Sequence, residues 1–171
     1  DAMYNYALMF LNGEGVPVNV DEFFKYLKLA IENGNSEAMF ELANMYFQGK
    51  GVQASIDESI KYYKMAIEKG NSSAMYCYGL ILYSGKGVTV DKEMAAKYFK
   101  MAADNGHDQA MAIYSNMLST GDGIPVNLEE AQKYNKMIWE SFGSFGEEEE
   151  EEEECNDPNR RPMFLQIAFN T

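Results

Sequence analysis

Apolar residues recur along the chain at the three-to-four-residue spacing of an amphipathic helix. Between residues 38 and 47, for example, Ala38, Leu42, Met45 and Tyr46 share one face of a helix. The same pattern predicts the first helix of a pair over residues 2–11, 38–47, 74–83 and 110–119. A Gly-x-Gly element follows each of these segments, and its first glycine accepts the left-handed backbone that ends a helix.

A second amphipathic helix follows each Gly-x-Gly element. It is predicted to begin after one equivalent position that always holds a good N-cap residue: Asn19, Ser55, Asp91 and Asn127. Three of the four have glutamate three residues later, which predicts a capping box: Glu22, Glu58 and Glu130. The second helices are predicted to end at Gly34, Gly70 and Gly106. The next first helix is then expected to be capped by Ser36, Ser72 or Asp108.

Three landmarks recur four times in one register of 36 residues: Ala-Met from residue 2, Gly-x-Gly from residue 13 and Lys-Tyr from residue 25. A period of this length is typical of stacked helical repeats. We therefore predict an all-α protein, a right-handed α-α superhelix (α-solenoid) of four helix-turn-helix repeats. The array is expected over residues 1–142, with repeats at 1–36, 37–72, 73–108 and 109–142. Residues 143–171 form an acidic linker and an apolar C-terminal segment.

The repeated pattern Ala-x-x-x-(Leu/Tyr)-(Gly/Ala)-x-x-(Tyr/Phe)-x-x-Gly-x-Gly-Val, followed by Ala-x-x-x-Gly, resembles the Sel-1-like repeat, a longer-looped relative of the tetratricopeptide repeat. The best match runs from Ala38 to Gly70, and the resemblance reaches about Trp139. The fourth repeat departs from the pattern, with Ile138 and Phe142 in place of a small residue and a glycine, so it looks like the last of the array. The resemblance implies an adaptor or scaffold that binds proteins or peptides. The alternative is a regulatory or targeting segment of a larger signalling enzyme such as a protein kinase.

In tetratricopeptide-like superhelices the first helices line the concave face. The resemblance therefore implies a partner-binding face made of Tyr4, Leu8, Phe40, Asn44, Phe47, Gln48, Tyr76, Leu80, Tyr83 and Asn116. Asn44 and Asn116 are suited to hydrogen-bond the backbone of an extended peptide, while the rings hold its side chains. No lysine or arginine occupies these positions, which favours an apolar or basic partner segment. The alternative interpretation is that the rings pack between repeats and the amides are solvated.

Charge and composition narrow the classes of partner. The net charge is −13, and an uninterrupted run of glutamates occupies residues 147–154. This acidity argues against binding to nucleic acid or to anionic lipid, since both need clustered lysine and arginine. No stretch approaches the roughly 20 apolar residues of a membrane span. The two cysteines have no paired spacing, so we expect neither a disulfide framework nor a metal site. We also expect that the chain binds no cofactor and that it is located in the cytoplasm.

Catalytic residues are not indicated, and we expect that the chain is not an enzyme. His107 is the single histidine and occupies the turn between repeats where Asn35 and Asn71 stand earlier, which predicts a turn residue. Cys77 has no histidine in register and therefore no base to activate it. The Gly-x-Gly elements lack the Lys-Ser/Thr of a phosphate-binding loop.

Residues 163–169 are apolar and follow the acidic run. They are expected to cap the end of the last repeat, to lie in the concave groove of the same or a neighbouring chain as a route to self-association, or to begin a further domain. Because the chain starts at Asp1 and not at methionine, we expect it to be a piece of a longer protein.

Overall fold

The structure, a computed structural model, describes residues 2–142. This part of the chain contains eight helices and no strand: α1 (Ala2–Asn12), α2 (Val20–Glu32), α3 (Ser36–Gln48), α4 (Ile56–Glu68), α5 (Ser72–Ser84), α6 (Lys92–Asp104), α7 (Asp108–Thr120) and α8 (Leu128–Phe142). The predicted linker and apolar segment at residues 143–171, including 163–169, lie outside the described residues.

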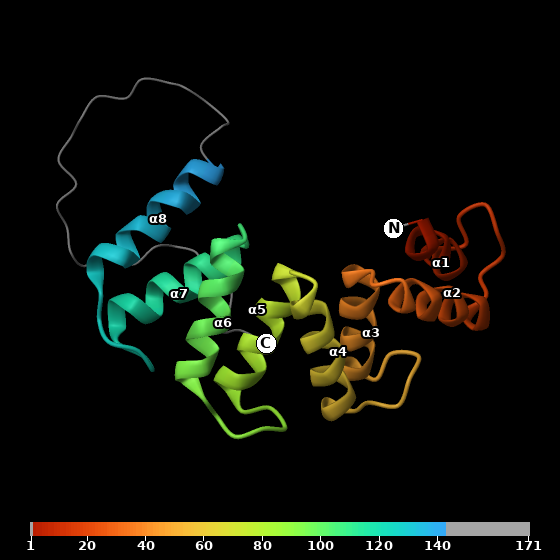
Figure 1. The fold of residues 1–171 in the computed structure, drawn as a ribbon, viewed down its shortest axis with the longest axis horizontal. Helices are drawn as coiled ribbons and strands as arrows, with labels where there is room; N and C mark the ends of the chain where they lie inside the picture. Colours follow the sequence, from red (N-terminus) through yellow and green to blue (C-terminus); the bar gives the residue numbers. More distant parts are fainter. Residues whose placement is uncertain (1, 143–171) are drawn as a thin grey trace.

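The helices pack in consecutive pairs, and each pair packs on the next to form a helical solenoid (Figure 1). The prediction of an all-α array of four repeats is confirmed. The pairs follow an arc whose ends, α1 and α8, turn toward the same side. One repeat cannot bury its apolar face by itself, so the core extends across successive repeats, in two clusters of buried residues.

Close approach of the two helices in a pair depends on a small residue in the first helix. In the third repeat this residue is Gly79, and a Cβ atom added there would lie 2.7 Å from the ring of Phe99 on α6. In the fourth repeat Ser115 takes the position, and its hydroxyl donates to the side-chain oxygen of Asn135 at 2.8 Å. The two helices of the third repeat are therefore packed around the ring of Phe99, and those of the fourth repeat are joined by this hydrogen bond.

The first helices of repeats two to four begin earlier than expected. Their N-caps are Asn35, Asn71 and His107, whose side chains accept from the backbone N–H groups of Ala38, Ala74 and Ala110. The prediction that Ser36, Ser72 or Asp108 would cap these helices was wrong by one residue. Asn35, Asn71 and His107 have the extended backbone of an N-cap residue, and each side chain bonds the N–H three residues onward.

The second helices begin where the sequence predicts, with N-caps that include Asn19, Ser55 and Asp91. Only half of each predicted capping box forms. The cap side chains accept the backbone N–H groups of Glu22, Glu58 and Glu130, but the cap N–H groups donate to backbone carbonyls and not to these glutamates. The backbone N–H of Ser55 donates to the carbonyl of Tyr46 at 2.9 Å, which ties the loop back to the preceding helix. Glu58 is left to pair with Lys61 at 3.0 Å. The N-cap donor is satisfied by the fold of the loop, so no glutamate is needed for it.

The cap at His107 makes the stability of this turn sensitive to pH. Its Nδ1 accepts the N–H of Ala110 at 3.3 Å, and burial lowers the pKa of the imidazole below its ordinary value. The unfolded chain therefore binds the proton more readily, so stability is present above about pH 6.5 and is lost as pH falls from there through the lowered pKa. A protonated imidazole also has no lone pair left to accept the N–H.

We expect His107→Asn, which installs the cap residue of the earlier repeats, to remove this dependence. Urea unfolding of both proteins at pH 8 and at pH 5.5 would measure it. The free energies should be similar at pH 8, and the variant should be the more stable at pH 5.5. A difference between the two proteins that does not change with pH would contradict the role of the neutral imidazole.

Candidate protein-binding surface

Three aromatic residues stand at one equivalent position of the first helices in successive repeats: Tyr4, Phe40 and Tyr76. Each is half-buried. The ring of Phe40 packs on Tyr63 at 6.0 Å, and that of Tyr76 stacks on His107 at 4.6 Å. The repeat core therefore supports these rings and leaves part of each in solvent.

The two asparagines of the predicted face differ in their surroundings. The side-chain oxygen of Asn44 accepts the hydroxyl of Tyr63 at 2.6 Å, so this amide supports the core beneath it. Asn116 is exposed, and its side chain has no hydrogen bond to any described residue. Only Asn116 therefore presents both its donor and its acceptor for a partner.

Lysines contact two of the predicted rings, contrary to the expectation of a face without cations. Lys86 of the Gly-Lys-Gly loop places its Nζ 4.0 Å from the centre of the Phe47 ring. Tyr83 donates to Asp122 at 2.5 Å, and the Nζ of Lys92 lies 5.0 Å from its ring. The sequence pattern did not indicate these lysines, because Lys86 belongs to the loop of the next repeat and Lys92 to the helix that comes after Tyr83.

The remaining predicted residues divide by burial. Leu8 and Leu80 are half-buried and pack against the two core clusters, while Gln48 is exposed at the end of α3. The leucines therefore contribute mainly to packing.

Two glutamates that the sequence analysis did not single out lie beside this face. Burial, then the charges of Glu41 and Glu37, raise the pKa of Tyr4, which places both carboxylates near its hydroxyl. Glu37 accepts the side-chain amide of Asn71 at 2.8 Å, and Glu41 has no ion pair with any described residue. The signal in the sequence was their spacing, because Glu37 and Glu41 are four residues apart and therefore share one face of the helix.

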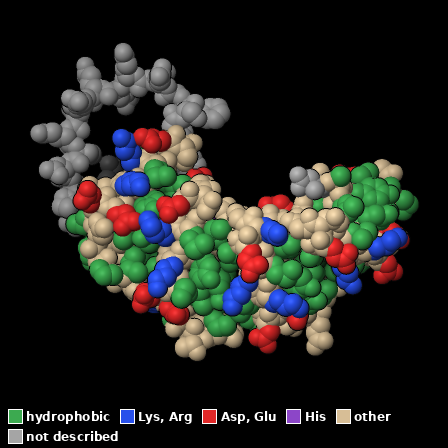
Figure 2. Space-filling view, in the orientation of Figure 1, with side chains coloured by type: hydrophobic (Ala, Val, Ile, Leu, Met, Phe, Trp, Pro, Cys, Tyr) green, Lys and Arg blue, Asp and Glu red, His purple; other side chains and the backbone are tan. Residues whose placement is uncertain are grey.

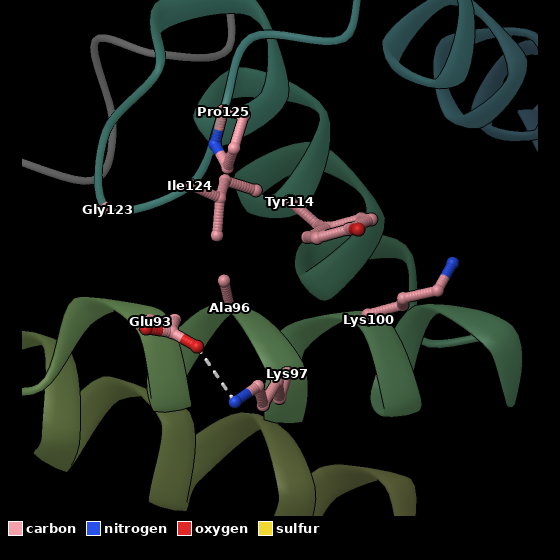
Figure 3. Close-up of a pocket in the computed structure, with 8 residues that line it drawn as sticks. All are labelled: Glu93, Ala96, Lys97, Lys100, Tyr114, Gly123, Ile124 and Pro125. Carbon is pink, nitrogen blue, oxygen red and sulfur yellow. Dashed lines mark hydrogen bonds and ion pairs between the residues drawn. The ribbon is translucent and has the colours of Figure 1, made fainter.

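A shallow hollow of about 250 Å³ lies between the third and fourth repeats (Figure 3). It is lined by Glu93, Ala96, Lys97, Lys100, Tyr114 and residues 123–125. Its lysines already have partners, since Lys97 pairs with Glu93 at 2.9 Å and Lys100 with Glu130 at 2.8 Å. The hollow therefore has no lysine directed at a bound molecule.

A family model of the Sel1 repeat matches residues 1–35, 36–71, 72–107 and 108–134. The chain belongs to the Sel1 repeat family. Sel1 repeat proteins are generally scaffolds for protein–protein interaction and are mainly non-catalytic. A comparison with curated proteins gave no match.

Solved Sel1 repeat structures share this fold. A Sel1 repeat protein from Oxalobacter formigenes is 30% identical with a TM-score of 0.76, over 82% of this chain and 57% of that one. The c5321 protective antigen of uropathogenic Escherichia coli is 31% identical with a TM-score of 0.73, over 82% of this chain and 30% of that one. Cysteine-rich protein B of Helicobacter pylori is 23% identical with a TM-score of 0.53, over 67% of this chain and 86% of that one, and supports the fold alone. The present chain therefore spans about half the length of the Oxalobacter formigenes protein and about a third of the length of the Escherichia coli antigen.

Cys77 lies half-buried on α5, and burial raises the pKa of its thiol. A raised pKa disfavours the thiolate that acts as a nucleophile.

In residues 2–142 no helix has the length and apolar character needed to cross a membrane.

Proposed function

We propose that this Sel1 repeat array binds a protein partner through an extended segment that lies along the first helices, on the concave side of the arc. The partner contacts the supported rings of Tyr4, Phe40 and Tyr76 and the exposed amides of Gln48 and Asn116. Figure 2 shows the molecule hollowed along the side toward which α1 and α8 turn.

The observation that carries the proposal is the row of half-buried rings at one position of successive first helices. A ring held by the core on one side loses little conformational entropy when a partner covers the other side. Exposed polar groups beside such rings can pair with the partner's backbone, since an extended segment has its N–H and C=O groups free. A row of supported rings along successive first helices therefore suits a partner segment that has no regular secondary structure of its own.

Charge indicates the chemistry of that segment. Glu41 lies near Tyr4 without an ion pair to a described residue, so this end of the surface suits a lysine or arginine of the partner. A cation beside a carboxylate and an aromatic ring gains from both. Lys86 over Phe47 supplies the opposite charge further along. The partner segment is therefore apolar, with a basic residue toward α1 and α3.

The test is capture of partners from a lysate by the 171-residue chain and by the double variant Gln48→Arg and Asn116→Arg. Both side chains are exposed and have no side-chain bond to a described residue, so the fold should tolerate the change. We expect at least a tenfold loss of affinity for the captured partner, or about 1.4 kcal/mol. Mass spectrometry identifies the partner and titration measures its Kd.

Gln53→Arg with Gln132→Arg is the matched control, since it adds the same charge at exposed glutamines away from the first helices. Partners should bind it as they bind the parent chain. Equal loss in both double variants would indicate a general charge effect, and retention in both would place binding elsewhere.

A further inference from the structure

The hollow between the third and fourth repeats lies at a helix position that holds a small side chain in this repeat alone among the first three. The equivalent residues of α2, α4 and α6 are Phe24, Ile60 and Ala96. The ring of Phe24 lies beside Gly51 of the next repeat, and Ile60 packs against the core cluster. Gly123 is the equivalent of Gly51, and together with Ala96 it lines the hollow of about 250 Å³. The hollow therefore takes the place of a large apolar side chain at the earlier junctions.

The walls of the hollow are mainly apolar. Figure 3 shows the side chain of Ile124 opposite the methyl group of Ala96, with the ring of Tyr114 at one side. At the rim, Lys97 is paired with Glu93 at 2.9 Å. An apolar group that enters this space leaves water without separating an ion pair, and burial of apolar surface is the main favourable term in association.

The loop that forms one wall has backbone groups available to a partner. The N–H groups of Ile124 and Val126 donate to no described residue, whereas that of Asn127 donates to the carbonyl of Leu118 at 2.9 Å. Because Pro125 follows Ile124, the backbone before it is biased toward an extended conformation. Main-chain hydrogen bonds to an extended segment give affinity, and a pocket beside them selects its side chain. The loop and the hollow together supply both.

The size of the hollow indicates its occupant. Pockets that hold drug-sized ligands enclose roughly 300–1,000 Å³. This hollow is smaller, at about 250 Å³, and the chain itself places phenylalanine or isoleucine at the equivalent position of the two earlier repeats. A single apolar side chain of that size therefore suits it better than a free small molecule.

We infer that the hollow is a second protein-docking site, which receives one isoleucine, leucine or phenylalanine side chain from an extended segment of a partner protein. The backbone of that segment pairs with the N–H groups of Ile124 and Val126. The site lies between α6 and the loop that follows α7, on the outer side of the arc (Figure 1). It uses none of the rings on the concave side, so it does not rest on the function proposed for them.

The test uses two blocked pentapeptides, Gly-Ser-Ile-Ser-Gly and Gly-Ser-Ala-Ser-Gly, titrated into the ¹⁵N-labelled 171-residue chain and followed by NMR. The isoleucine peptide should shift the amide signals of Ala96, Ile124 and Val126. The alanine peptide should bind at least tenfold more weakly, because it lacks the side chain that the hollow buries.

Three variants separate the hollow from the rest of the surface. Ala96→Ile fills it with the residue of the second repeat and should abolish the shifts. Ile60→Ala opens the equivalent space one repeat earlier and should add shifts at Val88 and Val90. Met101→Ile is the matched control, since it changes an exposed apolar side chain on α6 outside the hollow, and it should bind as the parent does. Circular dichroism checks the helices of each variant.

Equal binding of the two peptides, or shifts that survive Ala96→Ile, would overturn the inference. If Ala96→Ile loses its helices, the absence of new shifts in Ile60→Ala would do the same. Two further outcomes would assign the hollow to another occupant and exclude an outside partner. Without peptide, amide signals of residues 163–169 that move on Ala96→Ile would indicate the chain itself, and shifts that grow with protein concentration would indicate a second copy.

Discussion

Phe99→Ala is expected to lower the free energy of unfolding by about 3–5 kcal/mol, the cost of removing a fully buried ring from a close-packed core. Phe99 has no exposed surface and packs beside Tyr76 and Tyr83. Gly79 leaves the space that the ring occupies, with its missing Cβ only 2.7 Å from the ring. The substitution would therefore open a cavity at the centre of the third repeat, and urea unfolding followed by circular dichroism would measure the loss.

The matched control is Met101→Ala on the same helix. Met101 is 42% exposed, so its truncation should change stability by no more than about 0.5 kcal/mol. Because each repeat contacts only its neighbours, the transition of Phe99→Ala should also broaden as the third and fourth repeats unfold first. Similar losses in the two variants would show that the stability of α6 does not depend on burial of the Phe99 ring.

Gly123→Ala is expected to destabilise the protein by about 2–5 kcal/mol through two separate costs. The backbone at Gly123 has φ +81°, where an added side chain costs about 1–2 kcal/mol. The new Cβ would also overlap the Cβ of Lys92 on α6, and relieving such an overlap costs about 1–3 kcal/mol. Thermal unfolding with a reversible transition would measure the total.

Gly106→Ala separates the two costs. Gly106 has nearly the same backbone, with φ +80°, and an added Cβ there meets nothing within 4 Å. The Gly106→Ala variant should lose only the stability that the strained backbone costs, about 1–2 kcal/mol. The difference between the two variants then measures the close approach of the 123–125 loop to α6. Equal losses would mean that Lys92 moves aside at no cost.

The periodicity of the sequence by itself determined the repeat architecture. Ala-Met, Gly-x-Gly and Lys-Tyr recur four times at 36 residues, and each landmark has a local meaning, since caps, turns and helix faces depend on residues close along the chain. The starts of the second helices followed for the same reason. The caps of the first helices were misplaced by one residue, because Asn35 and Ser36 are both good cap residues and only the backbone distinguishes them.

The tertiary structure decided what equivalent positions do. Asn44 and Asn116 occupy the same place in their repeats, yet Asn44 accepts the hydroxyl of Tyr63 on the second helix of its own repeat, whereas the second helix of the fourth repeat has Asn135 in place of that tyrosine. Lys86 covers Phe47 from a loop 39 residues further along the chain. Such contacts depend on which side chains two packed helices or loops bring together, and the hydrophobic pattern along one helix contains no information about that pairing.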